Sequence, residues 1–232
     1  EVTQGFWCPP IENLDPLILI DERETKLNKN KILISIIKDK KIVESKSIET
    51  EGSIKIKISK VFGKKISAPY GILCKFKYKN YTKIVIRYDT ENSSGDCVHA
   101  WDCNWRIENN KLSPEIIDNK STARKFFYFK NNFDEISYFL LLYVNKKKHL
   151  LDNILKIRIL LDNKREFLKT INLDFNDPMP IINLKNLIDI NTFGIFTDGI
   201  VQIESQYDNI LSTFFICDSK KNAVITDHLT GG

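Results

Sequence analysis

The residues best suited to chemistry gather in one short stretch, from Asp96 to Trp105. Within it, Cys97, His99 and Cys103 offer the sulfur and imidazole ligands that bind zinc and other transition metals. If the stretch is a loop, all three could reach one ion. If it is a strand, Cys97 and Cys103 lie about 20 Å apart at ~3.3 Å per residue, too far to share an ion. The spacing matches no recognised zinc motif, and we expect no cofactor.

The same stretch also predicts a second kind of site. Trp101, Trp105 and His99 could together form an apolar stacking platform with polar neighbours, as sugar-binding surfaces require. The alternative interpretation is that the two tryptophans pack against the segment that joins the halves of the chain. Both interpretations stay open at the level of sequence.

A histidine recurs at a matching place in the second half of the chain. His99 follows Asp89 by the same interval that separates His228 from Asp218. Asp227 and His228 are therefore candidate ligand-binding residues, although no cysteine lies beside them. A repeated histidine fits a shared ligand-binding or proton-transfer position. A single histidine is more often a structural residue, and that alternative remains open.

Catalytic motifs are missing from the sequence. It contains no Gly-x-Ser-x-Gly, no glycine-rich phosphate loop and no His-Glu-x-x-His. Acidic residues are numerous, but no spacing pairs two of them for general acid and base catalysis. The sequence therefore favours a protein that is not an enzyme. A metal-dependent enzyme domain built on Cys97, His99 and Cys103 is the catalytic alternative.

An internal similarity organises the chain that must position these residues. Leu17 to Ile72 aligns without a gap to Leu140 to Ile195, 123 positions later. Identical residues in this alignment include Leu17/Leu140, Ile34/Ile157, Ile36/Ile159, Asp39/Asp162, Gly71/Gly194 and Ile72/Ile195. We therefore predict two copies of one unit: residues 1–107, a linker at 108–125, and residues 126–232.

Short β-branched and aromatic runs separated by turn residues predict strands. Residues 53–60 alternate isoleucine with polar residues, chiefly lysine, which is typical of a half-buried strand. We expect an extended lead-in at 5–10, a loop or edge at 176–180 and a short helix at 181–190. Strands are expected at 17–20, 31–38, 53–60, 72–78, 84–88, 126–129, 138–144, 154–161, 167–173, 200–204 and 211–217. The predicted fold class is all-β: two tandem antiparallel β-sandwich units related by internal duplication.

Composition limits the classes of partner. The 232 residues are 42% hydrophobic and 28% charged, which is typical of a soluble globular protein. The net charge of +5 comes mainly from lysines interleaved with acids, so we expect no nucleic-acid partner. No apolar run is long enough for a membrane span. Five irregularly spaced cysteines favour reduced thiols, and hence a cytoplasmic location.

The second half resembles the sensory rhodopsin transducer family of small β-sandwich proteins. The resemblance involves three segments: Asn176 to Pro180, Phe193 to Ile203, and Tyr207 to Thr213. The first half lacks the Asp-Pro-Met-Pro sequence of the first segment and is related only through the internal similarity. The resemblance implies a sandwich similar to carbohydrate-binding folds, with protein binding or self-association in place of catalysis. It assigns no ligand residues.

These observations lead to one expected function and its alternatives. We expect a non-catalytic binding or assembly module that presents loops or an edge strand to a protein partner or to another copy of itself. The first alternative is a carbohydrate-binding or carbohydrate-processing accessory module, and the second is the metal-dependent enzyme.

Overall fold

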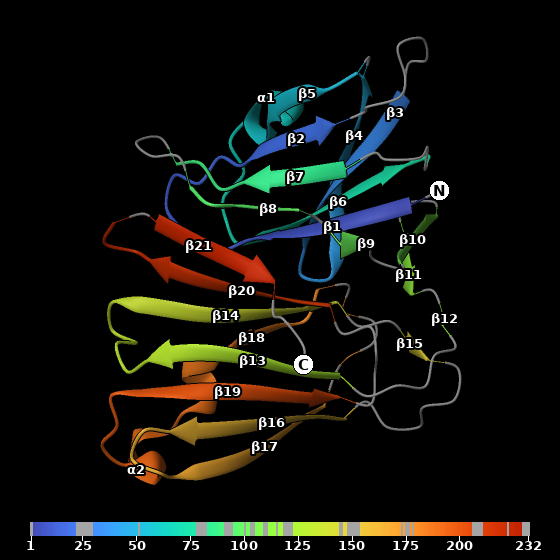
Figure 1. Cartoon of the computed structure of the whole chain (residues 1–232). Coiled ribbons are helices and arrows are strands. Elements are labelled where there is room, and N and C mark those ends of the chain that lie inside the picture. Colours follow the sequence, from blue (N-terminus) through green and yellow to red (C-terminus); the bar gives the residue numbers. More distant parts are fainter. Residues whose placement is uncertain are drawn as a thin grey trace. The chain divides into compact units, whose positions relative to one another are not determined.

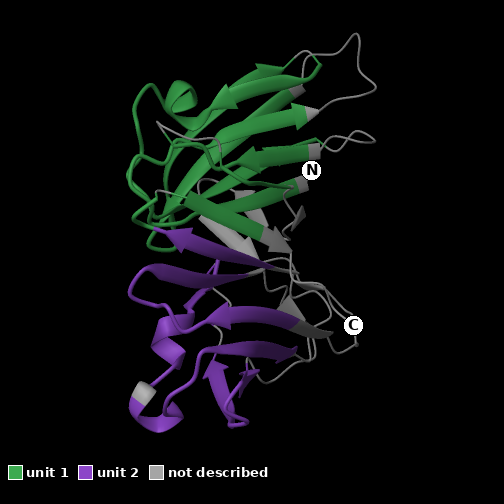
Figure 2. Ribbon diagram, turned by 60° about the vertical axis from the view of Figure 1, so that its left-hand side comes forward, with its two compact units in different colours: residues 1–113, 219–226 green, residues 114–218, 227–232 purple. Residues whose placement is uncertain are grey.

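The structure is a computed structural model, and its described residues cover most of the chain. They are residues 2–21, 30–50, 52–77, 83–90, 95–99, 101–102, 105–108, 111–114, 116–117, 123–143, 146–147, 154–172, 174, 177, 179–205, 211–221 and 223–228. The chain divides into two compact units, which Figure 2 colours separately. Unit 1 comprises residues 1–113 and 219–226, and unit 2 comprises residues 114–218 and 227–232.

Unit 1 is built from two antiparallel sheets (Figure 1). One has the order β4-β3-β6-β1-β9, formed by β1 (Val2–Cys8), β3 (Asn30–Lys38), β4 (Lys41–Thr50), β6 (Tyr70–Phe76) and β9 (Trp101–Asp102). The other has the order β5-β2-β7-β8, formed by β2 (Leu17–Asp21), β5 (Ile54–Lys57), β7 (Lys83–Arg87) and β8 (Cys97–His99). Helix α1 (Ile58–Phe62) follows β5. Ile32, Ile34 and Ile36 are buried because alternate residues of β3 face the core.

The second half also has two antiparallel four-stranded sheets. One has the order β13-β19-β16-β17, formed by β13 (Ala123–Lys130), β16 (Ile154–Leu161), β17 (Glu166–Asn172) and β19 (Asp198–Ser205). The other has the order β18-β14-β20-β21, formed by β14 (Ile136–Tyr143), β18 (Ile181–Asn183), β20 (Leu211–Asp218) and β21 (Ala223–His228). A 3-10 helix, η1 (Leu184–Leu187), and a short helix, α2 (Ile190–Phe193), lie between β18 and β19. The expected all-β fold of two tandem units is confirmed.

Four short strands complete the secondary structure. Strands β10 (Trp105–Glu108) and β11 (Lys111–Pro114) pair with each other. Strands β12 (Ile116–Ile117) and β15 (Lys146–Lys147) form a parallel pair. The range expected as a linker, 108–125, therefore contains β11, β12 and the beginning of β13. None of the described helices is long and apolar enough to span a membrane.

The two halves share one strand order. Read from its β17 edge, the sheet β17-β16-β19-β13 corresponds strand by strand to β4-β3-β6-β1. In the same way, β18-β14-β20-β21 corresponds to β5-β2-β7-β8. The sequence order of the corresponding strands is also the same. This correspondence relates the fold of one half to that of the other, whereas a common origin by duplication remains a hypothesis.

The pairing of residues between neighbouring strands shows which part of the gapless alignment agrees with the fold. Ile34 lies opposite Lys46 in β4, and Ile157 lies opposite Lys169 in β17. Each residue of the first pair lies 123 positions before its counterpart in the second pair, as the alignment requires. The alignment is wrong further along the chain. Ile72 is buried in β6, whereas Ile195 is 94% exposed and precedes β19. If β3 corresponds to β16, the register of the neighbouring strand places Ile72 with Val201.

A lysine and a phenylalanine close one edge of each sandwich in the same way. The Lys46 ammonium lies 6.0 Å from the ring centre of Phe62, and the Lys169 ammonium lies 5.7 Å from that of Phe193. In both halves the phenylalanine ends a short helix and precedes a glycine with positive φ, 72° at Gly63 and 69° at Gly194. The counterpart of Gly194 is therefore Gly63, and the expected pairing with Gly71 is wrong.

Two local predictions also need correction. The expected strand at 53–60 ends at Lys57, and helix α1 begins at Ile58, although the isoleucine alternation continues into it. Asp15, remote in sequence, accepts hydrogen bonds from the backbone N–H and the hydroxyl of Ser59 and so stabilises the start of the helix. The expected short helix at 181–190 is replaced by β18 and η1.

The extended lead-in is a full strand of the first sheet. β1 lies between β6 and β9, and it buries Phe6 and Trp7. The expectation that residues 5–10 are extended is correct for the part within β1. The proline pair that follows, Pro9 and Pro10, lies outside the strand, because proline cannot donate a ladder hydrogen bond.

Gly199 is required where β19 crosses the core of unit 2. A Cβ atom added there would lie 2.8 Å from the carbonyl oxygen of Leu160 and 2.8 Å from the Cζ atom of Phe129. Backbone must shift to admit it, so we expect Gly199→Ala to lower the free energy of unfolding by about 1–3 kcal/mol. Urea unfolding followed by circular dichroism measures this. Thr170→Ala on the exposed side of β17 is the control, and equal losses in the two variants would contradict the packing described.

Candidate functional site

The described residues from Cys97 to Trp105 lie on three different strands. Cys97 and His99 lie in β8 of one sheet, whereas Trp101 lies in β9 of the other, paired with Gly5 of β1. The chain therefore crosses between the two sheets of unit 1 between His99 and Trp101. Trp105 begins β10. This change of sheet places Cys97 and His99 on a different sheet from Trp101.

The structure describes only part of the candidate ligand set. Cys97 is exposed, but Cys103 lies outside the described residues. The backbones of His99, Trp101, Trp105, Asp227 and His228 are described, whereas their side chains are not. Within the described part of the chain, no group of three His, Cys, Asp or Glu side chains could hold a metal ion. The metal and glycan sites in this stretch therefore remain predictions.

The two matching histidines occupy corresponding backbone places. His99 is the last residue of β8, and His228 is the last residue of β21. These strands hold the same position in their respective sheets. A shared role for the two histidines remains a prediction, because the correspondence concerns the backbone alone.

The buried cysteines are unsuited to nucleophilic catalysis. Burial raises the pKa of Cys74 and of Cys217 to about 12, and it also raises the pKa of Cys8. A thiol with such a pKa stays protonated at neutral pH, and the thiolate is the reactive form. These three residues are core side chains of their strands.

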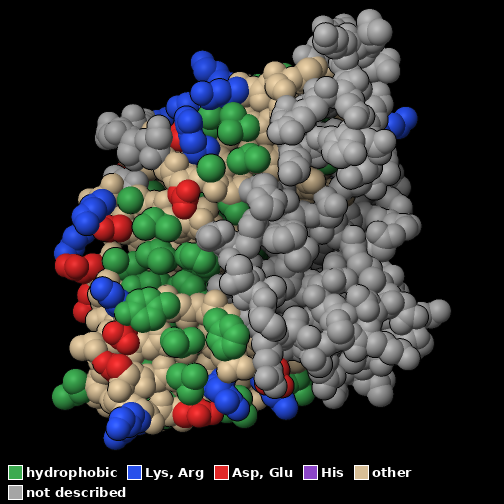
Figure 3. Space-filling model, viewed as in Figure 1, with side chains coloured by type: hydrophobic (Ala, Val, Ile, Leu, Met, Phe, Trp, Pro, Cys, Tyr) green, Lys and Arg blue, Asp and Glu red, His purple; other side chains and the backbone are tan. Residues whose placement is uncertain are grey.

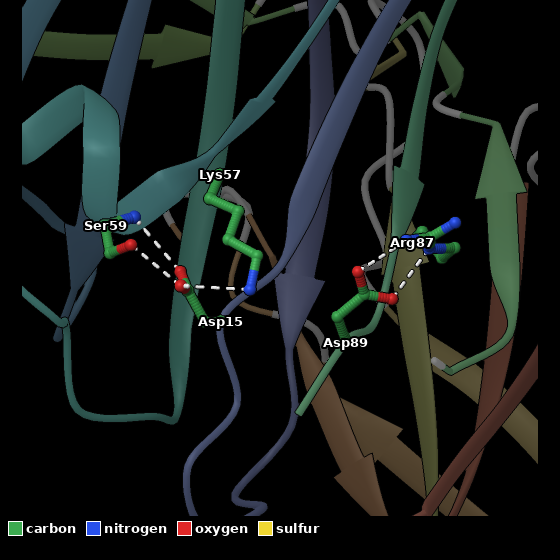
Figure 4. A network of polar contacts seen from close by, with 5 residues as sticks. All are labelled: Asp15, Lys57, Ser59, Arg87 and Asp89. Atoms are coloured by element: carbon green, nitrogen blue, oxygen red, sulfur yellow. Dashed lines mark hydrogen bonds and ion pairs between the residues drawn. The ribbon is translucent and has the colours of Figure 1, made fainter. Parts of the chain in front are cut away.

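A polar network fixes the loop before β2 in unit 1 (Figure 4). Arg87 donates from Nε and Nη2 to the two carboxylate oxygens of Asp89, with both distances 2.7 Å. The backbone N–H of Asp15 donates to the carbonyl of Asp89 at 2.8 Å. The Asp15 carboxylate contacts Ser59 and lies 3.9 Å from the Lys57 ammonium. Burial acts to raise the pKa of Asp89, but the hydrogen bonds and charge of Arg87 prevail and lower it. The network is structural, because each charged group is used to hold a neighbouring segment.

A cavity of about 360 Å³ opens beside this loop. Its walls come from the β1–β2 loop and from the segment between α1 and β6. They comprise Pro10, Ile11, Glu12, Asn13, Leu14, Lys65, Ile66, Ser67 and Ala68. Charged side chains of opposite sign and aliphatic groups share this lining, and no histidine or cysteine is among them. The cavity therefore gives little indication of a particular ligand.

The clearest candidate surface is the outer face of the sheet β13-β19-β16-β17. We call it the outer face of unit 2, meaning the outward residues of these four strands. Register places them in rows across the sheet. The three central rows are Tyr128, Ile200, Leu160 and Glu166; then Phe126, Gln202, Arg158 and Leu168; then Glu204, Lys156 and Thr170. Lys130 and Asp198 lie in a further row at one end of the strands, and Ile154 and Asn172 lie in one at the other end. The opposite face of the same strands contributes Phe127, Phe129, Ile157 and Val201 to the core.

Large apolar side chains are exposed across this outer face. Phe126 is 46% exposed, Tyr128 51%, Ile200 41% and Leu168 62%. Three of the four strands contribute these residues, so they form a group and are not scattered singly. In Figure 3, apolar side chains gather over the strands of unit 2, with acidic and basic side chains around them. Clustered exposed apolar residues with a polar rim are typical of interaction surfaces.

Charged residues on the outer face are arranged in cross-strand pairs. Arg158 Nε lies 3.1 Å from Glu166 Oε1, and both side chains are about half exposed. Lys156 lies directly opposite Glu204 in the ladder between β16 and β19. The surface therefore combines aromatic and aliphatic groups with an arginine, and aromatic residues and arginine are enriched in protein interfaces.

The corresponding positions of unit 1 have a different character. Strand register places Phe126 with Gly5, Arg158 with Ser35 and Gln202 with Leu73. Gly5 and Ser35 are buried, whereas Phe126 and Arg158 are exposed; Leu73 is buried, as is Gln202. The exposed apolar face is therefore a property of unit 2 and does not follow from the shared strand order.

Sequence reasoning missed this face. Phe126 to Phe129 are aromatic at four consecutive positions, so alternation could not separate core residues from surface residues. A weak signal was present. Alternate residues of a strand point to opposite faces, so a strand with large apolar residues at every position must either bury both faces or expose one of them. The sequence alone did not distinguish these two outcomes.

Comparisons with known proteins add little to this description. No protein-family model matches the chain, and no curated protein matches it. Among solved structures, a serine-rich repeat protein (Srr2) of Streptococcus agalactiae is similar, at 11% identity and a TM-score of 0.25. The similarity covers 98% of this chain and 84% of that one. A likeness this weak carries no functional inference, and the resemblance to the sensory rhodopsin transducer family remains a prediction.

Proposed function

We propose that the protein is a non-catalytic binding and assembly module that docks another protein on the outer face of unit 2. The observation that carries this proposal is the group of four large apolar side chains, each at least 41% exposed, on one hydrogen-bonded sheet. Because the sheet fixes their backbones, little conformational entropy is lost when a partner covers them. Burial of this apolar area supplies the main driving force for association.

The chemistry of the outer face favours a protein partner over a glycan. Ile200, Leu160 and Leu168 offer aliphatic surface and no hydrogen-bonding groups, whereas sugar hydroxyls need precisely placed donors and acceptors. The Phe126 side chain likewise lacks a polar atom. A protein partner can cover these side chains with apolar groups of its own and match the charged residues at the rim.

Lysine substitutions on the outer face test this proposal. Phe126→Lys and Leu168→Lys each place an ammonium within the apolar group, and we expect either change to weaken complex formation at least tenfold. Cross-linking of the full chain, in pure form and in extract of its source cells, followed by mass measurement, identifies the complex. Circular dichroism verifies that each variant folds.

The matched control is Val43→Lys, which replaces an exposed apolar residue on β4 of unit 1. We expect this variant to form the same complexes as the wild type. If the lysine variants on unit 2 form unchanged complexes, the docking surface lies elsewhere. If the wild type binds glycans on an array and Tyr128→Ala abolishes that binding, the carbohydrate alternative replaces the proposal.

A further inference from the structure

The partner of the outer face follows from the arrangement of its rows. We infer that the occupant is a second copy of this chain, stacked face to face about a two-fold axis that runs along the strands between β19 and β16. This inference rests on the proposed function and specifies the partner. In such an arrangement, β13 of one copy lies over β17 of the other, and β19 lies over β16.

Each row is then matched by its own reversed copy. Phe126 faces Leu168 of the second copy, and Ile200 faces Leu160, so the apolar residues cover one another. The two-fold axis produces every such contact twice. Aligned packing of two sheets is an established geometry, and it tolerates the ~30° crossing angle that strand twist imposes.

The charges are complementary under the same operation. Glu204 of one copy faces Lys156 of the other, so the charged row contributes two opposite-charge pairs across the interface. In the first row, the Tyr128 hydroxyl faces the Glu166 carboxylate. At one end of the strands, Asp198 of one copy would lie near Asp162 of the other, whereas none of the three central rows brings two like charges together among the described side chains. This self-complementarity favours a second copy over an unrelated partner, which would need a matching surface of its own.

The area of the face sets the expected strength. Four strands at ~4.8 Å spacing, each about eight residues long at ~3.4 Å per residue, give about 500 Å² for each copy. The total of about 1,000 Å² lies at the lower end of specific interfaces, so we expect a reversible dimer with a dissociation constant in the micromolar range. Measurements should therefore cover roughly 1 to 500 µM protein.

Charge reversal provides a test that the two-fold arrangement alone predicts. In Lys156→Glu, Glu204 would face a glutamate of the second copy twice. In Glu204→Lys, Lys156 would face a lysine twice. We expect each variant alone to dimerise at least tenfold more weakly than the wild type. In a mixed dimer, Glu204 of the first variant faces Lys156 of the second, and the glutamate introduced at position 156 of the first faces the lysine introduced at position 204 of the second. Both charged contacts are then complementary, so an equimolar mixture should form a heterodimer that is tighter than either variant alone.

Sedimentation equilibrium on the full chain compares the wild type, each single variant and their equimolar mixture. The double variant Lys156→Glu/Glu204→Lys should dimerise like the wild type. Recovery on mixing supports the inference, because altered pairing within one chain is not repaired by adding a second variant. Two weakened variants that stay monomeric when mixed would overturn it. A wild type that is monomeric up to 500 µM would also overturn it. If the wild type is monomeric but binds a different protein, and Leu168→Lys abolishes that binding, the proposed function survives without the homodimer.

Discussion

Phe193→Ala is expected to lower the free energy of unfolding by about 3–5 kcal/mol. Phe193 is fully buried at the end of α2, and its ring stacks on Phe167 with ring centres 3.8 Å apart. The Lys169 ammonium lies 5.7 Å from the centre of the same ring. Removal of the ring leaves a cavity where the short helix closes the sandwich. Urea unfolding followed by circular dichroism measures the loss.

The control for this substitution also tests the corrected alignment. Ile195 lies two residues further along the chain and is 94% exposed, so Ile195→Ala should change the stability by less than about 0.5 kcal/mol. Ile72 is fully buried, and Ile72→Ala should lower the stability by about 2–5 kcal/mol. Similar losses for Ile72→Ala and Ile195→Ala would contradict the strand register and restore the gapless alignment.

Asp89→Asn is expected to lower the free energy of unfolding by about 1–3 kcal/mol at pH 7. The Asp89 side chain is only 8% exposed, and it accepts two hydrogen bonds from Arg87 at 2.7 Å. The asparagine keeps the shape of the side chain but removes its charge, so the Arg87 guanidinium loses its counter-ion. Thermal or urea unfolding of the two proteins at several pH values measures the difference.

The pH dependence of that difference has a defined direction. The pKa of Asp89 is lowered in the folded state, whereas an aspartate in the unfolded chain titrates near ~3.9. The stabilisation is therefore fully present above the unfolded pKa and is lost as the pH falls through the folded pKa. Wild type and Asp89→Asn should converge in stability as the pH falls below that unfolded value. Asp134→Asn is the control, because Asp134 is 97% exposed and its contact with Lys185 should contribute little. A gap between wild type and Asp89→Asn that persists unchanged in acid would contradict the assigned ion pair.

Much of the strand content follows from periodicity in the sequence. The segment 154–161 alternates between buried and exposed residues, and the expected strand has the same bounds as β16. Where both faces of a strand carry apolar residues, its approximate position was still predictable, because β-branched and aromatic residues favour strands whichever face is buried. The helix at Ile58 was not predictable, because Asp15, remote in sequence, supports its start.

The alignment error has a physical origin. The segment between β17 and β19 is longer than the one between β4 and β6, so a gapless offset cannot hold through both. Gly71/Gly194 and Ile72/Ile195 are identical in sequence yet lie in different structural settings. The hydrogen-bonded register, which pairs strands distant in sequence, reveals the correct counterpart of Ile72, and the contacts between lysine and phenylalanine reveal that of Gly194.

The candidate site was the least predictable feature. The outer face of unit 2 is assembled from strands whose sequence order is β13, β16, β17 and β19, and their spatial order exists only in the folded sheet. The residues singled out from sequence were chosen because they are chemically rare, namely cysteine, histidine and tryptophan. The exposed face is built from common apolar residues, and their significance depends on exposure, which spacing alone does not predict.

Nuclear magnetic resonance of the full chain at two concentrations tests the central claim most directly. Signals of the outward side chains on the outer face, especially the rings of Phe126 and Tyr128 and the methyl groups of Ile200 and Leu168, should shift between about 10 µM and 500 µM protein. The methyl groups of Val43 in unit 1 should stay unchanged. Shifts that spare the outer face and occur in unit 1, or an absence of any shift across this range, would contradict the assignment of this face as the surface through which the protein assembles.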